Sequence, residues 1–458
     1  MFHKIVLDSN YIGGGPTKRL MKIAFMLNMI FAFPLWAAES SARLSPHMAD
    51  ELLEKSGYRW QQTMLPTAEA DAKYGQADSA AKIHVNAFSR EFIMRTSELI
   101  LGISNSGPLD VIGGGITGVQ AGYEVYNLSS RFRLEAAQLN QELGRATTEQ
   151  YQNDLKFLLQ LRYLTAQQYK LRSEVADRLI SKDKELSLFA HKKLEAGVGI
   201  PLDLSRAEAM VERDQFKKLE AEASYQKSLY EIAELIPNFD FNCKLDALEF
   251  HELSAEAQKN ILSKKDHRGE LKVAELTLET TRKMKQSIDA ENKLTVSAMA
   301  EIGTIGTQAL GLINSPTGSL GLQITIPLYD GGYSKSRSAE ILSKLNSLEW
   351  QKQQVDLDTR NQLGATSSRL EFTKQVVLSS QRQTDLARKS LEYAERKIRI
   401  GSAGNLDLIT AQNDLALAMD LYVQAIYGYE ATKLQFFHLI SDLDGYLTSV
   451  SSSGGSNE

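Results

Sequence analysis

Two stretches of the sequence are near-copies of each other, and each has the features of a bend between two helices. Residues Lys193–Glu208 read K-L-E-A-G-V-G-I-P-L-D-L-S-R-A-E, and residues Lys397–Gln412 read K-I-R-I-G-S-A-G-N-L-D-L-I-T-A-Q. A constant offset of 204 residues relates Lys193, Gly197, Leu202, Asp203, Leu204 and Ala207 to Lys397, Gly401, Leu406, Asp407, Leu408 and Ala411. In each copy a glycine ends a helix, and the aspartate falls in the first turn of the next helix, where the helix dipole favours a carboxylate. The sequence therefore predicts two similar halves in tandem.

Long segments that lack proline flank both bends. They are rich in Leu, Ala, Gln, Glu, Lys and Arg, which favour helices. The predicted helices span residues 130–192, 202–236, 334–399 and 406–440. A helix over 130–192 would be roughly 95 Å long at 1.5 Å per residue. Helices of that length are typical of coiled or barrel-like packing rather than of a globular core.

Segments that alternate between two kinds of side chain predict strands. They span residues 67–74, 113–126, 294–307 and 319–329. In 113–126 one face is small, apolar and aromatic, which suits contact with lipid. Four strands cannot close a membrane barrel, because each unpaired backbone group in lipid costs several kcal/mol. We therefore expect other copies of the chain to complete the sheet, which makes the protein a homo-oligomer.

These elements predict a mainly α-helical fold with a transmembrane β part. The first repeat covers residues 46–236 and opens with a helix that Pro66 ends. A connector follows at 237–254, and the second repeat at 255–443 opens with a helix over 255–292. Residues 75–110 lack a clear period and are expected to form a long loop, and residues 444–458 are expected to be disordered.

The N-terminal region has the pattern of a secretory signal peptide over residues 1–37. Lys18, Arg19 and Lys22 precede the apolar run Ile23–Trp36, and small residues follow it. If translation starts at Met21, residues 1–20 are an upstream extension. An N-terminal anchor that is not cleaved is the alternative that this pattern leaves open.

Composition excludes several classes of function. The formal charge of -5 argues against nucleic-acid binding, which requires a basic surface. A single cysteine, Cys243, allows no internal disulfide and no zinc site built on several cysteines. The stretch Gly113–Gly118 matches G-x-G-x-x-G, but it precedes a strand pattern rather than a helix, so we expect no dinucleotide cofactor. The seven histidines lack metal-ligand spacing, and no catalytic constellation is visible, so the chain is not expected to be an enzyme.

The order of these elements and their end-motifs resembles the TolC-like outer-membrane efflux proteins. The residues that carry the resemblance are Ile326–Gly332 (I-P-L-Y-D-G-G), its weaker counterpart Tyr123–Asn127, and the two bends. The resemblance implies a homotrimer with a twelve-stranded barrel in the outer membrane and a helical barrel across the periplasm. It also implies a periplasmic adaptor protein and an inner-membrane pump as partners, in an efflux or type I secretion system.

The resemblance assigns roles to residues of the bends. Asp203 and Asp407 match the acidic residues that narrow the closed periplasmic end, and Thr410 stands where some exporters have a second carboxylate. Ala403 stands where those exporters have a basic residue, so the charge network of the closed end is expected to differ. The expected adaptor-docking bends consist of Gly197, Val198, Gly199, Gly401, Ser402 and Ala403. Asp203 and Asp407 also fit a simpler interpretation as residues that only stabilise helix starts.

A function of another class remains open at this point. A periplasmic coiled-coil scaffold without a pore would also contain long helices. The alternating segments argue against a scaffold, because it has no need of lipid-facing strands.

Overall fold

The structure is a computed structural model that describes residues 43–96, 110–254, 269–307, 315–399 and 405–451, with residues 256, 258 and 259. The chain divides into two units, residues 1–43 with 242–244, and Leu44–Phe241 with Leu245–Glu458. The arrangement described below is that of the second unit. The expected signal peptide over 1–37 and its upstream extension lie outside the described residues.

Helices dominate the described chain, and strands form a smaller part. The helices are α2 (Pro46–Ser56), α3 (Tyr58–Thr63), α4 (Leu65–Ala80), α6 (Leu128–Glu195), α7 (Pro201–Ala233), α9 (Gly269–Asp289), α10 (Tyr333–Arg399), α11 (Asn405–Leu439) and α12 (Leu443–Ser451). The strands are β1 (Arg43–Leu44), β2 (His84–Thr96), β3 (Asp110–Asn127), β4 (Lys244–Leu245), β5 (Thr295–Thr307) and β6 (Ser315–Thr325).

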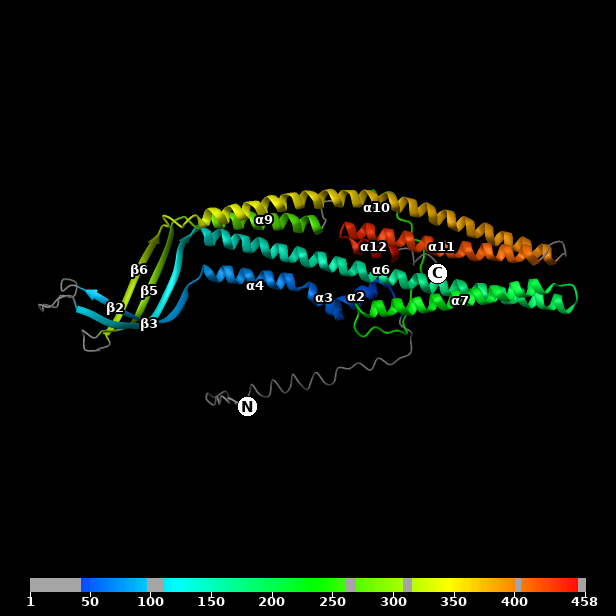
Figure 1. The fold of residues 1–458 in the computed structure, drawn as a ribbon, viewed down its shortest axis with the longest axis horizontal. Helices are drawn as coiled ribbons and strands as arrows, with labels where there is room; N and C mark the ends of the chain where they lie inside the picture. Colours follow the sequence, from blue (N-terminus) through cyan, green and yellow to red (C-terminus); the bar gives the residue numbers. More distant parts are fainter. Residues whose placement is uncertain are drawn as a thin grey trace, which may run out of the picture. The chain divides into compact units, whose positions relative to one another are not determined.

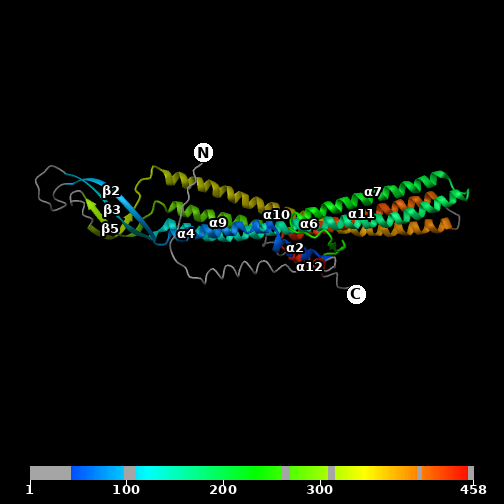
Figure 2. The same ribbon diagram turned by 90° about the horizontal axis from the view of Figure 1, so that it is seen from below.

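Two long helical hairpins and one sheet make up most of the second unit (Figure 1). Helix α6 packs against α7, and α10 packs against α11, so each hairpin has one bend of the repeat at its end. Figures 1 and 2 both show the bends at the end of the helices that is remote from the strands β2, β3, β5 and β6. Helices α4 and α9 pack beside α6 on the side of the strands.

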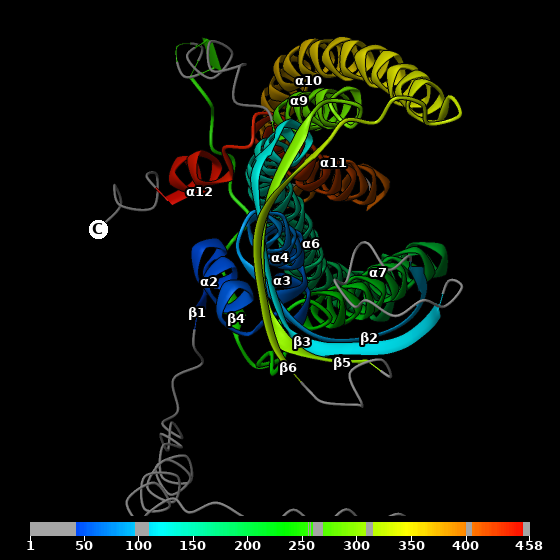
Figure 3. The ribbon, with the colours of Figure 1, turned by 90° about the vertical axis from the view of Figure 1, so that its left-hand side faces the viewer.

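The four longer strands form one antiparallel sheet in the order β2-β3-β5-β6. The middle pair, β3 and β5, comes from different halves of the chain, with Val119 opposite Ile302 and Tyr123 opposite Ala298. The sheet is curved when viewed along the helices (Figure 3). Within the described chain, β2 and β6 are the edge strands of this sheet.

The largest apolar core lies midway along the helices, where α11 meets α6, α10, α12 and the connector. Tyr429 and Phe436 are fully buried there, and Phe250 packs edge-on against the ring of Tyr429. Hydrogen bonds fasten the connector to a buried ion pair of α11, because Lys433 Nζ donates to His251 O at 3.1 Å and the amide of His251 donates to Glu430 Oε1 at 2.9 Å. This core holds the two repeats together well away from the bends.

Four sequence predictions are wrong. Pro66 does not end a helix, because it lies in the first turn of helix α4 (Leu65–Ala80). Residues 67–74 form part of helix α4 and not a strand, and the first strand of the four-stranded sheet is β2. Residues 75–110 are not one long loop, because α4 continues to Ala80 and β2 covers His84–Thr96. The expected disordered tail begins with helix α12, and residues 452–458 lie outside the described residues.

Candidate functional site

The first bend ends helix α6 with a left-handed glycine. Gly197 has φ +75, a conformation that residues with a Cβ rarely adopt. The amide of Val198 donates to Lys193 O at 3.1 Å, and the amide of Gly197 donates to Leu194 O at 3.0 Å. This pair of bonds is a Schellman motif, which satisfies carbonyl groups that the end of a helix leaves without partners. The turn therefore requires at position 197 a residue that tolerates the left-handed conformation, which glycine does best.

The second glycine of this bend is required for a different reason. A Cβ on Gly199 would lie 2.7 Å from Leu194 N and 2.9 Å from Lys193 C, which is closer than real Cβ contacts allow. The apolar side chains beside it point into solvent, and Val198 is 76% exposed. Ile200 and Leu202 are likewise exposed. The bend therefore presents an apolar surface on a tightly fixed backbone.

The two acidic residues begin the helices that follow the bends. Asp203 is in the first turn of α7, half-buried, and its amide donates to Ile200 O at 3.1 Å. Asp407 is in the first turn of α11 and is exposed. The hydroxyl of Thr410 donates to Leu406 O of its own helix at 2.9 Å. In the second bend, Gly401, Ser402 and Ala403 lie outside the described residues.

Apolar packing joins the two hairpins just behind their bends. One core cluster contains residues from α6, α7, α10 and α11, namely Leu186, Ala190, Ala207, Met210, Leu391, Ala394, Ile398, Leu408, Ile409, Ala411 and Leu415. Ala207 and Ala411 are equivalent residues of the repeat and both are buried in it. The structure therefore brings the helix ends that flank the two predicted bends together at one end of the unit.

A buried polar group that sequence reasoning missed lies behind this cluster. Asp183 of α6 and Asp214 of α7 are 0% and 1% exposed. Gln412 Nε2 of α11 donates to Asp183 Oδ1, and Arg213 Nε donates to Asp214 Oδ1 at 2.8 Å. Burial, and then the neighbouring Asp214 carboxyl, raise the pKa of Asp183 to about 7.

The sheet has two chemically different faces, which the register defines. One face is apolar and exposed, and we call it the apolar sheet face; its members are Val85, Ala87, Val119, Ala121, Tyr123, Ala298, Ala300, Ile302, Leu320, Leu322 and Ile324. On the other face Arg90 Nη2 donates to Gln120 Oε1 at 2.8 Å, and Arg90 Nη1 lies 4.0 Å from Glu301 Oε1. The sheet therefore separates an apolar environment from a polar one.

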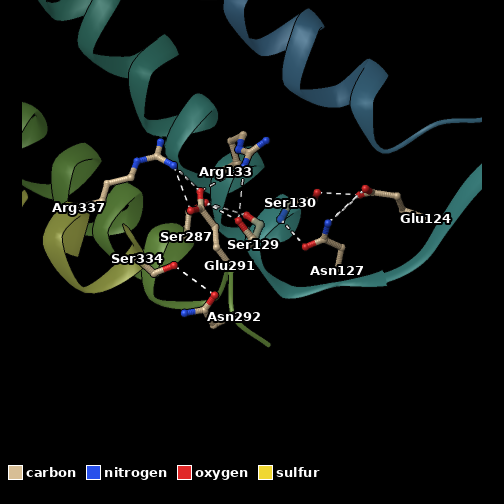
Figure 4. Close-up of polar contacts among 10 residues, drawn as sticks. All are labelled: Glu124, Asn127, Ser129, Ser130, Arg133, Ser287, Glu291, Asn292, Ser334 and Arg337. Atoms are coloured by element: carbon tan, nitrogen blue, oxygen red, sulfur yellow. Dashed lines mark hydrogen bonds and ion pairs between the residues drawn. The ribbon is translucent and has the colours of Figure 1, made fainter. Parts of the chain in front are cut away.

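Polar caps connect the strands to the long helices (Figure 4). The side chain of Asn127 ends β3 and accepts from the amide of Ser130 at 3.1 Å, which caps α6. Asp330 caps α10 in the same way, because it accepts from the amides of Gly332 and Ser334, both at 2.9 Å. The equivalent ends of the two halves therefore use the same device, a side-chain oxygen at the helix N-terminus.

At this junction the two halves also contact each other. Ser287 donates to Ser129 O at 3.0 Å, and the two buried hydroxyls are 3.0 Å apart. Arg337 donates to both oxygens of Glu291 at 2.8 and 3.0 Å, and Arg133 lies 3.9 Å from the same carboxylate. Figure 4 shows Glu291 between the two arginines. The sheet is thus fixed to α6, α9 and α10 together.

Three further features bear on the class of site. No group of three or more His, Cys, Asp or Glu side chains in the described part of the chain is placed to hold a metal ion. None of the described helices has both the length and the apolar character to cross a membrane. Gly113–Gly118 lies within strand β3, and the strand continues for nine residues beyond Gly118 before α6 begins, so no helix N-terminus follows these glycines directly.

The two-faced sheet joined to a repeated pair of long helical hairpins defines a protein of the TolC-like outer-membrane channel class. Residues 263–439 match the family model for outer membrane efflux proteins. The predicted resemblance and fold class are confirmed. The family that this segment matches consists of outer-membrane channel proteins and not of enzymes, and this likeness indicates an outer-membrane location.

The relatives agree in fold and differ widely in sequence. The outer membrane efflux protein BepC of Brucella suis is 26% identical over 132 residues, a match that spans 29% of this chain and 28% of that protein. The outer membrane protein VceC of Vibrio cholerae superposes with a TM-score of 0.73 at 15% identity, covering 86% of this chain and 96% of VceC. The outer membrane channel CmeC of Campylobacter jejuni superposes with a TM-score of 0.71 at 13% identity, covering 99% of both chains.

Proposed function

We propose that this protein is the exit duct of a tripartite efflux or type I secretion system. Three copies associate, so that their sheets form a twelve-stranded barrel and their helical hairpins form a tube across the periplasm. An inner-membrane pump supplies the energy, an adaptor protein joins the pump to the tube, and the duct conducts substrates passively. The match of residues 263–439 to the outer membrane efflux family supports this proposal.

The main support for the proposal is the four-stranded sheet, which has two unpaired edges and two chemically different faces. The edges of β2 and β6 have backbone groups that must be paired in lipid, and neighbouring copies of the sheet offer that pairing. The apolar sheet face suits contact with lipid, while the opposite face with Arg90, Gln120 and Glu301 suits a water-filled lumen. A closed barrel of three such sheets satisfies both requirements.

The bends are proposed as the periplasmic end of this duct. Asp203, Asp407 and Thr410 line the aperture, and in a trimer each becomes a ring of three. The adaptor docks on Gly197, Val198, Gly199, Gly401, Ser402 and Ala403. The exposed apolar side chain of Val198 on a rigid turn supports a docking role for the first bend.

Membrane fractionation combined with single-channel recording tests the duct. We expect the full-length protein in the outer-membrane fraction as a trimer, with stable conductance after reconstitution into planar bilayers. A scaffold without a pore is the competing function. If no preparation of the protein yields conductance, whether the protein is a trimer or a monomer, the scaffold is the correct function.

Replacing Asp407 with asparagine tests the acidic ring. A ring of carboxylates at a constriction attracts cations, so Asp407→Asn is expected to weaken Mg²⁺ block of the reconstituted channel by about tenfold, which corresponds to roughly 1.4 kcal/mol. The measurement is the Mg²⁺ concentration that halves the conductance. Asp444→Asn is the matched control, since Asp444 is exposed on α12, far along the chain from either bend. Equal block in wild type and Asp407→Asn would remove Asp407 from the aperture.

A further inference from the structure

The first hairpin contains two buried carboxyl groups that face each other across its helices. Asp183 is on α6 and Asp214 is on α7. The two residues lie at about the same distance along the sequence from the bend at Gly197. Antiparallel helices joined by a short bend place such positions side by side, and the Asp214 carboxyl is a neighbour that raises the pKa of Asp183. Both are buried, and neither belongs to the bend itself.

One oxygen of each carboxyl group has a partner, and the other does not. Asp183 Oδ1 accepts from Gln412, and Asp214 Oδ1 accepts from Arg213. Asp183 Oδ2 and Asp214 Oδ2 are buried without a hydrogen-bond donor. Two adjacent carboxylates in a dry site repel each other, whereas one shared proton turns one carboxyl into a donor and the other into its acceptor. The arrangement therefore suits a pair that holds one proton.

The charges that face this pair come from α7, and α11 contributes neutral amides. Arg213 Nε lies 2.8 Å and Lys217 Nζ 3.5 Å from Asp214 Oδ1. From α11, Gln412 donates to Asp183, and Asn413 accepts from Arg213 through its side-chain oxygen. Arg213 and Lys217 favour ionisation of Asp183, but burial and Asp214 oppose it more strongly and raise its pKa. The two cations balance the two carboxylates, so the pair attracts a proton more readily than an additional metal cation.

The second hairpin lacks this pair. The two bends are related by an offset of 204 residues. At this offset Ala387 is the equivalent of Asp183, and Ala418 is the equivalent of Asp214. Ala418 is 1% exposed, and its carbonyl accepts from Thr384 Oγ1 of α10 at 3.1 Å. At the equivalent positions, the α10–α11 hairpin therefore has apolar packing and a neutral hydrogen bond, whereas the α6–α7 hairpin has titratable groups.

We propose that Asp183 and Asp214 form a proton-dependent latch that holds α7 against α6 and α11. While the pair shares one proton, the first hairpin is closed along this stretch. When the proton leaves to solvent, the two carboxylates repel each other and the α6–α7 hairpin loosens, whereas the α10–α11 hairpin is unaffected. The latch itself concerns only helix packing; its consequence, a periplasmic end that opens more easily at alkaline pH, rests on the proposed duct.

The direction of the pH effect follows from the raised pKa of Asp183. A carboxyl group that binds its proton more tightly in the folded state stabilises that state at acidic pH. This stabilisation is fully present below the unfolded value of 3.8 and is lost as pH rises through about 7. Alkaline pH is therefore the condition that opens the latch.

Hydrogen–deuterium exchange of the full-length protein in detergent tests the latch at pH 6 and pH 9. Asp183→Asn keeps the shape of the side chain, accepts from Gln412 and donates to Asp214 at every pH. At pH 9 we expect amides of α7 around Asp214 to exchange about tenfold faster in wild type than in Asp183→Asn, which corresponds to one decade of the opening equilibrium. At pH 6 the two proteins are expected to exchange at equal rates.

Asp177→Asn is the matched control on the same two helices. Asp177 Oδ1 lies 2.7 Å from Lys218 Nζ, and the carboxylate is exposed. The hydrogen bond from Lys218 lowers the pKa of Asp177, so it is ionised at both pH values. Asp177→Asn is therefore expected to show the same difference from wild type at pH 6 and at pH 9.

Infrared spectroscopy of the wild-type protein gives a test that needs no variant. A buried protonated carboxyl absorbs apart from carboxylates, so a band present at pH 6 and absent at pH 9 is expected, and Asp183→Asn is expected to lack it. If wild type lacks such a band at pH 6, or if wild type and Asp183→Asn exchange equally at pH 9, there is no latch. Neither result depends on conductance, so the proposed duct stands or fails separately.

Discussion

Leu322→Arg is expected to remove most of the protein from the outer membrane. Leu322 is 71% exposed at the centre of β6, opposite Ala298, on the apolar sheet face. If that face contacts lipid, an arginine there costs about 2–4 kcal/mol near the middle of the bilayer. A cost of that size is a large part of the stability of an ordinary domain. Quantitative immunoblotting of the outer-membrane fraction measures the loss.

The neighbouring residue provides a matched control for this variant. Gln323 is also exposed, but it lies opposite Ser297 on the polar face of the same strand. Gln323→Arg adds the same charge and nearly the same volume one residue away, and a water-filled lumen accommodates it. We expect Gln323→Arg at the wild-type level. Equal amounts of the two variants in the membrane would contradict the assignment of the apolar sheet face to lipid.

The long helices and three of the four strands follow from the sequence because their patterns extend over many residues. The wrong strand at 67–74 shows where periodicity fails. Alanine and charged residues alternate there, but alanine favours helix, and only Ala70 of α4 is buried. Ala70 packs where α6 has Gly144, since a Cβ on that glycine would lie 2.7 Å from the Ala70 Cβ. Pro66 accordingly begins α4 instead of ending the preceding helix.

Strand β2 and helix α12 were missed for opposite reasons. Both faces of β2 mix polar and apolar side chains, and its Arg90 is accommodated by Gln120 on β3 and by the ring of Phe88, 4.5 Å from the guanidinium carbon. The partner Gln120 lies on another strand and is not visible in the segment itself. For α12 the signal was present, because Leu443, Tyr446 and Leu447 are buried at helical spacing.

The bend could be predicted from the repeat, and the latch could not. Gly197 and Asp203 recur at a fixed offset, so internal comparison finds them. The pair of Asp183 and Asp214 differs between the halves, and its third partner, Gln412, lies in the other repeat. A search for polar residues equidistant from each bend would have found the two carboxyl groups. Their burial depends on packing between α6, α7 and α11, which local sequence does not encode.

Gly199→Ala is expected to disrupt the first bend while leaving the sheet intact. Its Cβ would lie 2.7 Å from Leu194 N, so the backbone must move, and the hydrogen bond of 2.9 Å from the Gly199 amide to Lys193 O is strained or lost. Overpacking of this kind costs about 1–3 kcal/mol. Because the sheet lies at the far end of the helices, the amount of protein in the membrane is expected to match wild type (Figure 1).

The measurement that isolates the bend is limited trypsin digestion of the purified protein, with cleavage at Lys193 followed by mass spectrometry. A local loss of about 1.4 kcal/mol raises the population of the open bend, and hence cleavage, about tenfold. Gly197→Asn is the control, because Asn tolerates the left-handed conformation and no atom lies within 4 Å of the added Cβ. It is expected to be cleaved nearly as slowly as wild type.

Gly199 has no positive φ, so its backbone conformation does not call for glycine. If Gly199→Ala is cleaved faster than Gly197→Asn, the cause is therefore the close approach of residue 199 to α6. If instead Gly197→Asn is cleaved faster than Gly199→Ala, the left-handed backbone at position 197 contributes more to the stability of the bend than the close contact at position 199.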